Sequence, residues 1–257
     1  MHTADIRYRA DGRTMVGYLA YEDHRPGRRP AVLVAHEGPG LDAHAKGTAE
    51  RLAGLGYVAF ALDYNGAGAR LPMDQAAARI AELISEPDRA GQLGLAGLEV
   101  LLGQEAADPS RAAVIGYCFG AVVSLELART GADVKAVVGF HPGYTPPRTE
   151  ASRKIRASVL VCSGTDDPFA TAAQRADFED EMRQAGVADW RLELYGGVGH
   201  SFTNPAADQA DLPGIAYDAR ADRRSWRSAL ALFDEVLRPA DECESEVRDE
   251  VEGASPG

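Results

Sequence analysis

The sequence contains little of what would build a metal centre or a disulfide framework. Its three cysteines, Cys118, Cys162 and Cys243, show neither a C-x-x-C pair nor the spacing of metal ligands, and only six histidines are present. Structural zinc sites and disulfide-rich secreted domains both depend on such spacing. We therefore expect no metal, no cofactor and reduced thiols, which leaves the question of whether one cysteine is reactive.

Long apolar runs are also missing. No segment approaches the roughly 20 consecutive apolar residues that a membrane-spanning helix requires. Residues 1–5 lead almost directly into strand-like sequence, without the basic start and apolar run of a secretory signal. We expect a cytoplasmic protein with no membrane partner.

Positive charge is scarce, with 27 Lys and Arg against 39 Asp and Glu and a net charge of −12. Binding to nucleic acid needs clustered Lys and Arg to neutralise phosphates, so we expect no nucleic-acid partner. Residues 241–252 hold seven acidic residues and one arginine, which is half of the net charge. This segment has few groups to bury. We interpret residues 240–257 as a solvated, disordered tail and residues 1–239 as one domain.

Strand and helix patterns alternate from residue 30 onward. Residues 31–35 are a short apolar run, typical of a strand buried on both faces. Further strands are expected at 57–62, 112–115, 134–140, 158–162 and 190–195, and helices at 49–55, 121–129, 172–184 and 223–237, with helical stretches up to about 104. The alternation predicts a mostly parallel sheet with helices on both faces. The least defined region is 71–97.

A tight turn near the N-terminus adds an antiparallel element. Asp11-Gly12 is a strong turn signal, and it separates strand-like residues 6–9 from 16–21. We expect this hairpin at one edge of the sheet.

The most informative segment is Gly116-Tyr117-Cys118-Phe119-Gly120, which lies between a predicted strand and a predicted helix. Gly-x-Cys-x-Gly in this context is the nucleophile elbow of the α/β-hydrolase fold, with cysteine in place of serine. The strained turn needs small neighbours so that strand and helix can approach closely. At a helix N-terminus the dipole and the free N–H groups favour a thiolate and a developing oxyanion.

The other members of a triad follow in the order that this fold requires, acid before histidine. Asp166 and Asp167 come just after the strand at 158–162, and His200 lies in a glycine-rich loop after the strand at 190–195. An imidazole in that loop can relay protons for Cys118, while a carboxylate holds its tautomer and orientation. On the residues alone, either aspartate could be the acid.

At these positions the chain resembles the dienelactone hydrolase family. The likeness spans nearly the whole length and is carried by Ala35-His36-Glu37-Gly38, Tyr117-Cys118-Phe119-Gly120, Asp167-Pro168 and Gly199-His200-Ser201-Phe202. It implies the α/β-hydrolase fold with a Cys–His–Asp triad, and the family's type reaction opens a dienelactone ring to give maleylacetate. It also implies that Asp167 is the acid, because the family's acid directly precedes the position of Pro168. Asp166 then caps the following turn.

The resemblance implies two further features of the site. Glu37 matches a glutamate that contacts the resting thiol and helps generate the thiolate. The oxyanion hole is expected from the backbone N–H groups of Phe119 and Gly38, as the geometry of the fold requires.

The resemblance fails at the substrate anchor. Family members acting on dienelactone hold its carboxylate with arginines, one of them four residues beyond the catalytic histidine, where this chain has Asn204. An amide cannot replace a guanidinium as a bidentate charged partner. Arg70 and Arg79 are the remaining candidates for that charge.

The remaining candidate residues are interpreted without a catalytic role. His36 and His141 are interpreted as ordinary hydrogen-bonded histidines, and Cys162 as inert strand core. Tyr64, Tyr144 and Trp226 are candidates for apolar walls of the site.

The sequence therefore predicts a dienelactone hydrolase-like enzyme, a monomer or homodimer, that cleaves a small ester or lactone through Cys118. Two rivals stay open. One is a non-catalytic hydrolase-fold protein that binds a small ligand in the same cleft. The other is a thiol redox protein, although no resolving cysteine lies near Cys118 in the chain.

Overall fold

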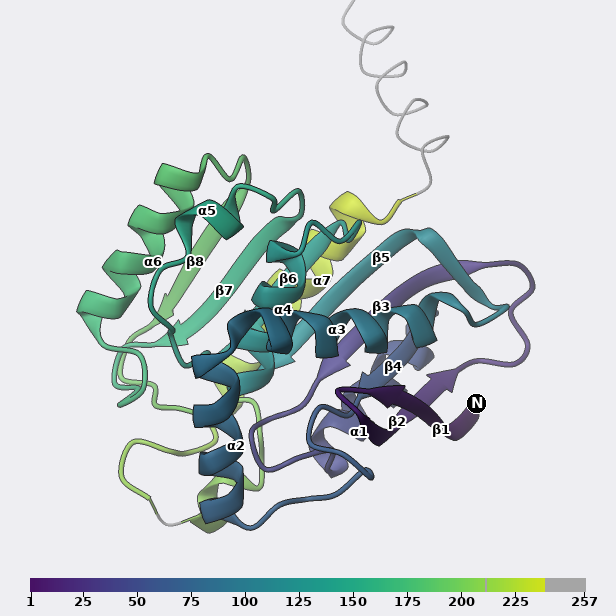
Figure 1. Ribbon diagram of the computed structural model, residues 1–257, viewed down its shortest axis with the longest axis horizontal. Coiled ribbons are helices and arrows are strands. Elements are labelled where there is room, and N and C mark those ends of the chain that lie inside the picture. The colour runs from purple at the N-terminus through teal and green to yellow at the C-terminus, as the bar shows by residue number, and fades with distance from the viewer. Residues whose placement is uncertain (211, 239–257) are drawn as a thin grey trace, which may run out of the picture.

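The computed structural model describes residues 1–210 and 212–238, and an eight-stranded sheet runs through this part of the chain (Figure 1). The strand order is β1-β2-β4-β3-β5-β6-β7-β8, with β1, β2 and β4 paired antiparallel and all other neighbours parallel. The strands are β1 (His2–Ala10), β2 (Arg13–Tyr21), β3 (Arg29–Ala35), β4 (Val58–Leu62), β5 (Ala107–Tyr117), β6 (Ala136–Phe140), β7 (Ser158–Gly164) and β8 (Trp190–Tyr195). This is the architecture that the alternating pattern and the Asp11-Gly12 turn predict.

Helices cover both faces of the sheet, and in Figure 1 α3 and α4 lie in front of it while α7 lies behind. The helices are α1 (Ala43–Gly54), α2 (Met73–Ser85), α3 (Pro87–Leu102), α4 (Phe119–Arg129), α5 (Thr149–Ser152), α6 (Ala172–Ala185), α7 (Ala219–Val236) and a 3₁₀ turn, η1 (Ala207–Ala210). None of the helices in the described ranges is long and apolar enough to cross a membrane.

The central strands are buried on both sides, so their side chains pack into two separate hydrophobic cores. In β3, Leu33 packs in one core, whereas its neighbours Val32 and Val34 pack in the other. The first core is closed by α2, α3, α4 and α6, and the second by α1 and α7. Alternation with a period of two explains why one strand can serve both cores.

Some element boundaries differ from the sequence-based expectation. Helix α7 begins at Ala219, four residues before the expected start, because the Asp218 side chain accepts the N–H groups of Arg220 and Ala221 and caps the helix there. Residues 71–97 contain α2 and most of α3. The division into a domain over 1–239 and a tail over 240–257 remains a prediction, since the acidic segment and Cys243 lie outside the described residues.

The parallel strands gather the candidate site residues at one edge. Glu37 follows β3, Cys118 follows β5, Asp167 follows β7 and His200 follows β8. Because these strands run parallel, their carboxyl ends meet at the same edge of the sheet, where open α/β sheets place their ligands.

Candidate active site

Cys118 occupies the sharp turn between β5 and α4. Its backbone angles, φ 52° and ψ −119°, lie in a region that residues other than glycine rarely adopt. A Cβ atom on Gly116 would lie 2.2 Å from the carbonyl oxygen of Gly120, and one on Gly120 would lie 2.3 Å from the carbonyl oxygen of Ala35. Strand, turn and helix approach this closely because both glycines lack a side chain. The thiol is thereby presented at the N-terminus of α4.

His200 and Asp167 form a buried hydrogen-bonded pair. His200 Nδ1 lies 2.8 Å from Asp167 Oδ2, and both side chains are almost fully buried. The second carboxylate oxygen, Oδ1, accepts the N–H of Phe169 at 2.8 Å. The backbone N–H of His200 donates to the carbonyl of Gly214 at 2.7 Å. Both partners are thus held from more than one side, which fixes the tautomer and orientation of the imidazole.

Cys118 lies within interaction range of the same imidazole. Burial of His200 opposes its protonation, but the charge and hydrogen bond of Cys118, together with those of Asp167, outweigh this and raise the pKa of His200 to about 10. At neutral pH the imidazole beside the thiol is therefore an imidazolium. This is the electrostatic state that a thiolate nucleophile requires.

The two predicted oxyanion-hole N–H groups lie at the same edge of the sheet, one at the start of α4 and the other in the loop after β3. Phe119 is the first residue of α4, so its N–H has no acceptor within the helix. In the described part of the chain, neither this N–H nor that of Gly38 donates to another protein group. The loop at Gly38 is fixed by Asn65, whose Nδ2 donates to the Gly38 carbonyl at 3.0 Å. Ile80 of α2 packs where a Gly38 side chain would lie, with Cδ1 only 2.5 Å from that Cβ position.

Glu37 lies at the site but makes a different contact from the one that the resemblance implies. Its Oε1 accepts the hydroxyl of Ser201 at 2.9 Å, and its Oε2 accepts Nδ2 of Asn204 at 2.6 Å. No hydrogen bond between Glu37 and the Cys118 thiol is formed in the described residues. Two donors on the turn after His200 occupy the carboxylate, and its contact with the thiol stays a prediction.

His36 and His141 are buried, hydrogen-bonded histidines, as expected. His36 Nδ1 lies 2.6 Å from the carbonyl oxygen of Glu37, and His141 Nε2 lies 2.8 Å from the hydroxyl of Thr203. Burial lowers the pKa of both imidazoles, so both are neutral near pH 7.

The three aromatic candidates lie in different places. Tyr64 packs beside the elbow, with its ring 5.8 Å from that of Phe119 and its hydroxyl donating to the carbonyl of His36 at 2.9 Å. Trp226 packs under the guanidinium of Arg51 in the core beneath α7. Tyr144 lines a separate cavity.

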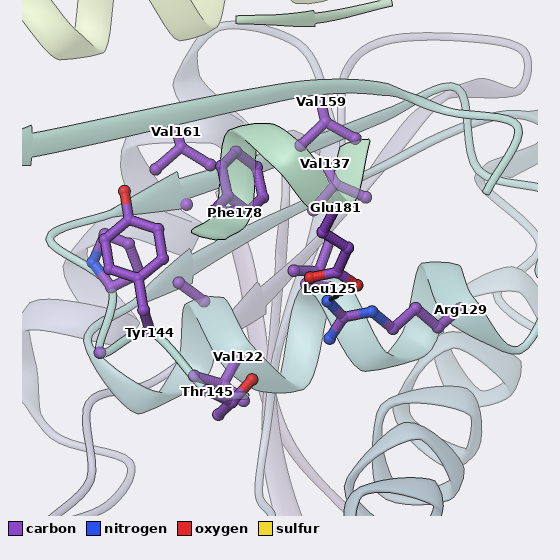
Figure 2. Close-up of a pocket in the computed structure, with 14 residues that line it drawn as sticks. Val122, Leu125, Arg129, Val137, Tyr144, Thr145, Val159, Val161, Phe178 and Glu181 are labelled. Carbon is purple, nitrogen blue, oxygen red and sulfur yellow. Dashed lines mark hydrogen bonds and ion pairs between the residues drawn. The ribbon is translucent and has the colours of Figure 1, made fainter. Parts of the chain in front are cut away.

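That cavity lies between α4, strands β6 and β7, and α6, and has a volume of about 30 Å³ (Figure 2). In Figure 2, Tyr144 lies at one end of it, and Arg129 and Glu181 point toward each other at the other. Its lining includes Val122 and Phe178 but none of Cys118, Asp167 and His200. A space of this size has room for little more than water.

The arginine candidates have different surroundings. Arg79 is buried and donates to Asp11 at 3.1 Å, to Glu82 at 2.8 Å and to the carbonyl of Tyr64 at 2.9 Å. It is only 5% exposed and anchors α2, with two carboxylates already paired to its charge, so it is a poor partner for a substrate carboxylate. Arg70 is exposed in the loop before α2.

Two further features are described within residues 1–210 and 212–238. There, no group of three or more His, Cys, Asp or Glu side chains is arranged to hold a metal ion. Cys162 is fully buried in β7, and burial raises the pKa of its thiol.

Two residues at the site were not singled out from the sequence. The ring of Phe169 lies 4.9 Å from that of His200 at a steep angle, although the side chain is 51% exposed. Its place two residues after Asp167 was a usable signal. Ser201 adopts a φ of 54° and binds Glu37, which is 164 positions away in the chain. No local pattern could reveal that contact.

Comparison with known proteins is consistent with this geometry. The profile of the dienelactone hydrolase family matches residues 15–237. Among solved structures, one described as m3DLH is 39% identical, with a TM-score of 0.89 and coverage of 92% of this chain and 99% of that chain. A dienelactone hydrolase-like promiscuous phosphotriesterase from metagenomic libraries is 36% identical, with the same TM-score and coverage. A carboxymethylenebutenolidase from a Pseudomonas species is 29% identical over 189 residues, which cover 70% of this chain and 77% of that protein.

Proposed function

Because the chain belongs to the dienelactone hydrolase family and is a hydrolase of ester or lactone bonds, we propose that it cleaves a small, uncharged ester or lactone through Cys118, His200 and Asp167. The observation that carries this proposal is the position of His200. Its Nδ1 lies 2.8 Å from Asp167, and the interaction with Cys118 helps to raise its pKa to about 10.

In the acylation step the Cys118 thiolate attacks the substrate carbonyl carbon. A C–S bond forms and the π electrons move to oxygen, where the N–H groups of Phe119 and Gly38 stabilise the oxyanion. When the intermediate collapses, the C–O bond to the leaving group breaks. The His200 imidazolium donates its proton to the departing alkoxide, which in a lactone stays attached to the acyl group.

In the deacylation step the neutral imidazole of His200 removes a proton from water. The resulting hydroxide attacks the thioester carbonyl, the C–S bond breaks and the thiolate leaves. The carboxylic acid is released, and the thiolate–imidazolium pair is restored. Asp167 stabilises the imidazolium in both steps without becoming protonated.

The preference for an uncharged substrate follows from the groups around the thiol. The Asn204 amide donates to the Glu37 carboxylate at 2.6 Å and is itself uncharged, so it gives an anionic substrate no charged partner. Arg79 is bound to Asp11, Glu82 and the Tyr64 carbonyl. The Glu37 carboxylate also adds negative charge at the site, which disfavours an anionic substrate.

The test is hydrolysis of p-nitrophenyl acetate, a neutral lactone and a dienelactone by the wild type and by Cys118→Ala. We expect fast turnover of the neutral substrates, slower turnover of the anionic dienelactone, and loss of at least about 10³-fold in kcat without the thiol. Full activity of Cys118→Ala would contradict the triad. Fast opening of the dienelactone would contradict the charge preference, and loss of that activity in Arg70→Ala would identify the anchor. If a folded protein neither turns over these compounds nor reacts at Cys118 with iodoacetamide, the ligand-binding alternative is favoured.

A second candidate activity is the hydrolysis of an uncharged phosphotriester. It is favoured by the 36% identity, over 92% of this chain, to the structure named as a promiscuous phosphotriesterase. A p-nitrophenyl phosphotriester added to the same panel tests it. Turnover that requires Cys118 would support the second activity, and the absence of turnover with active enzyme would exclude it for that substrate.

A further inference from the structure

Glu37 connects the end of β3 to the turn that carries His200. Ser201 directly follows the histidine and donates to Oε1 of Glu37 at 2.9 Å, and Asn204 donates to Oε2 at 2.6 Å. Both donors are buried, with 8% and 7% of their surface exposed. Hydrogen bonds to an ionised acceptor in such a setting are strong and directional.

Glu37 is itself firmly placed. Its carbonyl accepts the N–H of Gly40 at 3.1 Å and lies 2.6 Å from Nδ1 of His36, whose own carbonyl accepts the hydroxyl of Tyr64 at 2.9 Å. The carboxylate therefore projects from a loop that several hydrogen bonds hold in place. From such a loop it can fix the position of a neighbouring segment.

The donor side of the contact is also predetermined. Asn204 Oδ1 accepts the N–H of Ala206 at 3.0 Å, which leaves Nδ2 pointing at Glu37. The backbone N–H of Asn204 donates to the carbonyl of Ser201 at 2.9 Å, so both donors belong to one closed turn. Glu37 thus binds both donors of this turn at the same time.

We propose that Glu37 is a positioning residue, which holds the turn 200–204 so that the His200 imidazole stays aligned between Asp167 and Cys118. Asp167 fixes the rotation of the ring through Nδ1, whereas Glu37 fixes the backbone from which the ring projects. The proposal rests on the function proposed above. A displacement of about 1 Å between reacting groups can cost about 100-fold in rate, so such a contact matters for turnover.

In this contact Ser201 and Asn204 donate and Glu37 accepts, and exchanging donor and acceptor provides a specific test. In Glu37→Gln the charge of the acceptor is lost and the amide carbonyl can serve only one of the two donors. Either the new N–H faces the Asn204 N–H, where flipping Asn204 would break its bond to Ala206, or the new N–H faces the Ser201 hydroxyl, which must then accept. In Asn204→Asp two carboxylates face each other. In the double variant Glu37→Gln/Asn204→Asp the glutamine N–H can donate to the new carboxylate, its carbonyl still accepts from Ser201, and the net charge of the wild type is kept. Glu50→Gln is the matched control, since Glu50 is an exposed carboxylate that binds the Tyr18 hydroxyl.

We expect each single variant to lower kcat by about 10- to 100-fold with KM within about threefold of the wild type. The double variant should recover to within about fivefold, a coupling that a double-mutant cycle measures. Iodoacetamide alkylation of Cys118 and the NMR signal of the His200 imidazole provide readouts that do not depend on substrate. Both should change in the single variants and return in the double variant.

Two results would overturn the proposal. One is wild-type kcat in Asn204→Asp together with Cys118-dependent activity. The other is a folded double variant no more active than the weaker single variant, with an unchanged His200 signal throughout. Full activity of Cys118→Ala would instead refute the proposed function itself, so the two failures can be told apart.

Discussion

The elbow that carries Cys118 and the turn that carries His200 are built in different ways. The elbow is fixed by close packing of backbone around its glycines, since a Cβ on Gly116 would lie 2.2 Å from the oxygen of Gly120 and one on Gly120 would lie 2.3 Å from the oxygen of Ala35. The turn is fixed by hydrogen bonds to distant residues. Asp167 lies 33 positions from His200, and Glu37 lies 164 positions from Ser201.

This difference separates two ways of failing. Packing at the elbow leaves no room for added atoms, so substitutions of its glycines should act first on stability. The turn depends on directional contacts, so removing one of them should act first on the alignment of His200 and on turnover. Four predictions test this division, from the largest expected effect to the smallest.

The largest effect is expected for Asp167→Asn, which changes the long-range contact that holds the imidazole. The amide cannot stabilise the imidazolium and favours the wrong tautomer, so kcat should fall by about 10²- to 10⁴-fold with little change in unfolding. Steady-state kinetics and thermal unfolding measure the two quantities. Asp166→Asn is the control, because Asp166 is exposed and its Oδ1 accepts only the neighbouring Thr165 hydroxyl. If Asp166→Asn proved the more damaging, the acid would be misassigned.

At the elbow, Gly120→Ala should act on stability. The added Cβ would lie 2.3 Å and 2.4 Å from the carbonyl oxygens of Ala35 and His36, which are backbone atoms that cannot move aside. We expect a loss of about 1–3 kcal/mol in the free energy of unfolding, measured with urea. Gly47→Ala is the control, since Gly47 lies inside α1 with open space around it and should gain about 0.5–1 kcal/mol. Equal stability of the two variants would remove the distinction between elbow and turn.

The same division explains how much the sequence could predict. The sheet, the hairpin and the elbow follow from short-range signals, namely alternation, Asp11-Gly12 and Gly-x-Cys-x-Gly. The two hydrogen bonds of the Glu37 carboxylate could not be predicted, because its partners Ser201 and Asn204 lie at the other end of the chain. Local patterns identify which residues reach the site, but long-range donors decide what each of them contacts.

A third prediction concerns the charge of His200. Its pKa of about 10 depends on Cys118 as well as on Asp167. Because this pKa exceeds the ordinary value of 6.5, the contribution of His200 to stability is complete below pH 6.5 and is lost as the pH rises to about 10. In Cys118→Ala the pKa should fall, since burial still opposes protonation and Asp167 acts alone. NMR titration of the imidazole measures both values, and an unchanged pKa would show that the thiol and the imidazole are not coupled.

The smallest effects are expected at Ser201, where the hydroxyl and the backbone can be tested separately. Ser201→Ala removes the bond to Glu37 but keeps the φ of 54°, so it should cost about 1 kcal/mol in the free energy of unfolding. Ser201→Gly loses the same bond but relieves a backbone strain of about 1 kcal/mol, so its stability should stay near that of the wild type. Both variants should lose the same few-fold in kcat, because both leave the turn with only the Asn204 contact to Glu37. If Ser201→Gly were instead fully active while Ser201→Ala was impaired, backbone strain rather than the contact with Glu37 would control the His200 turn.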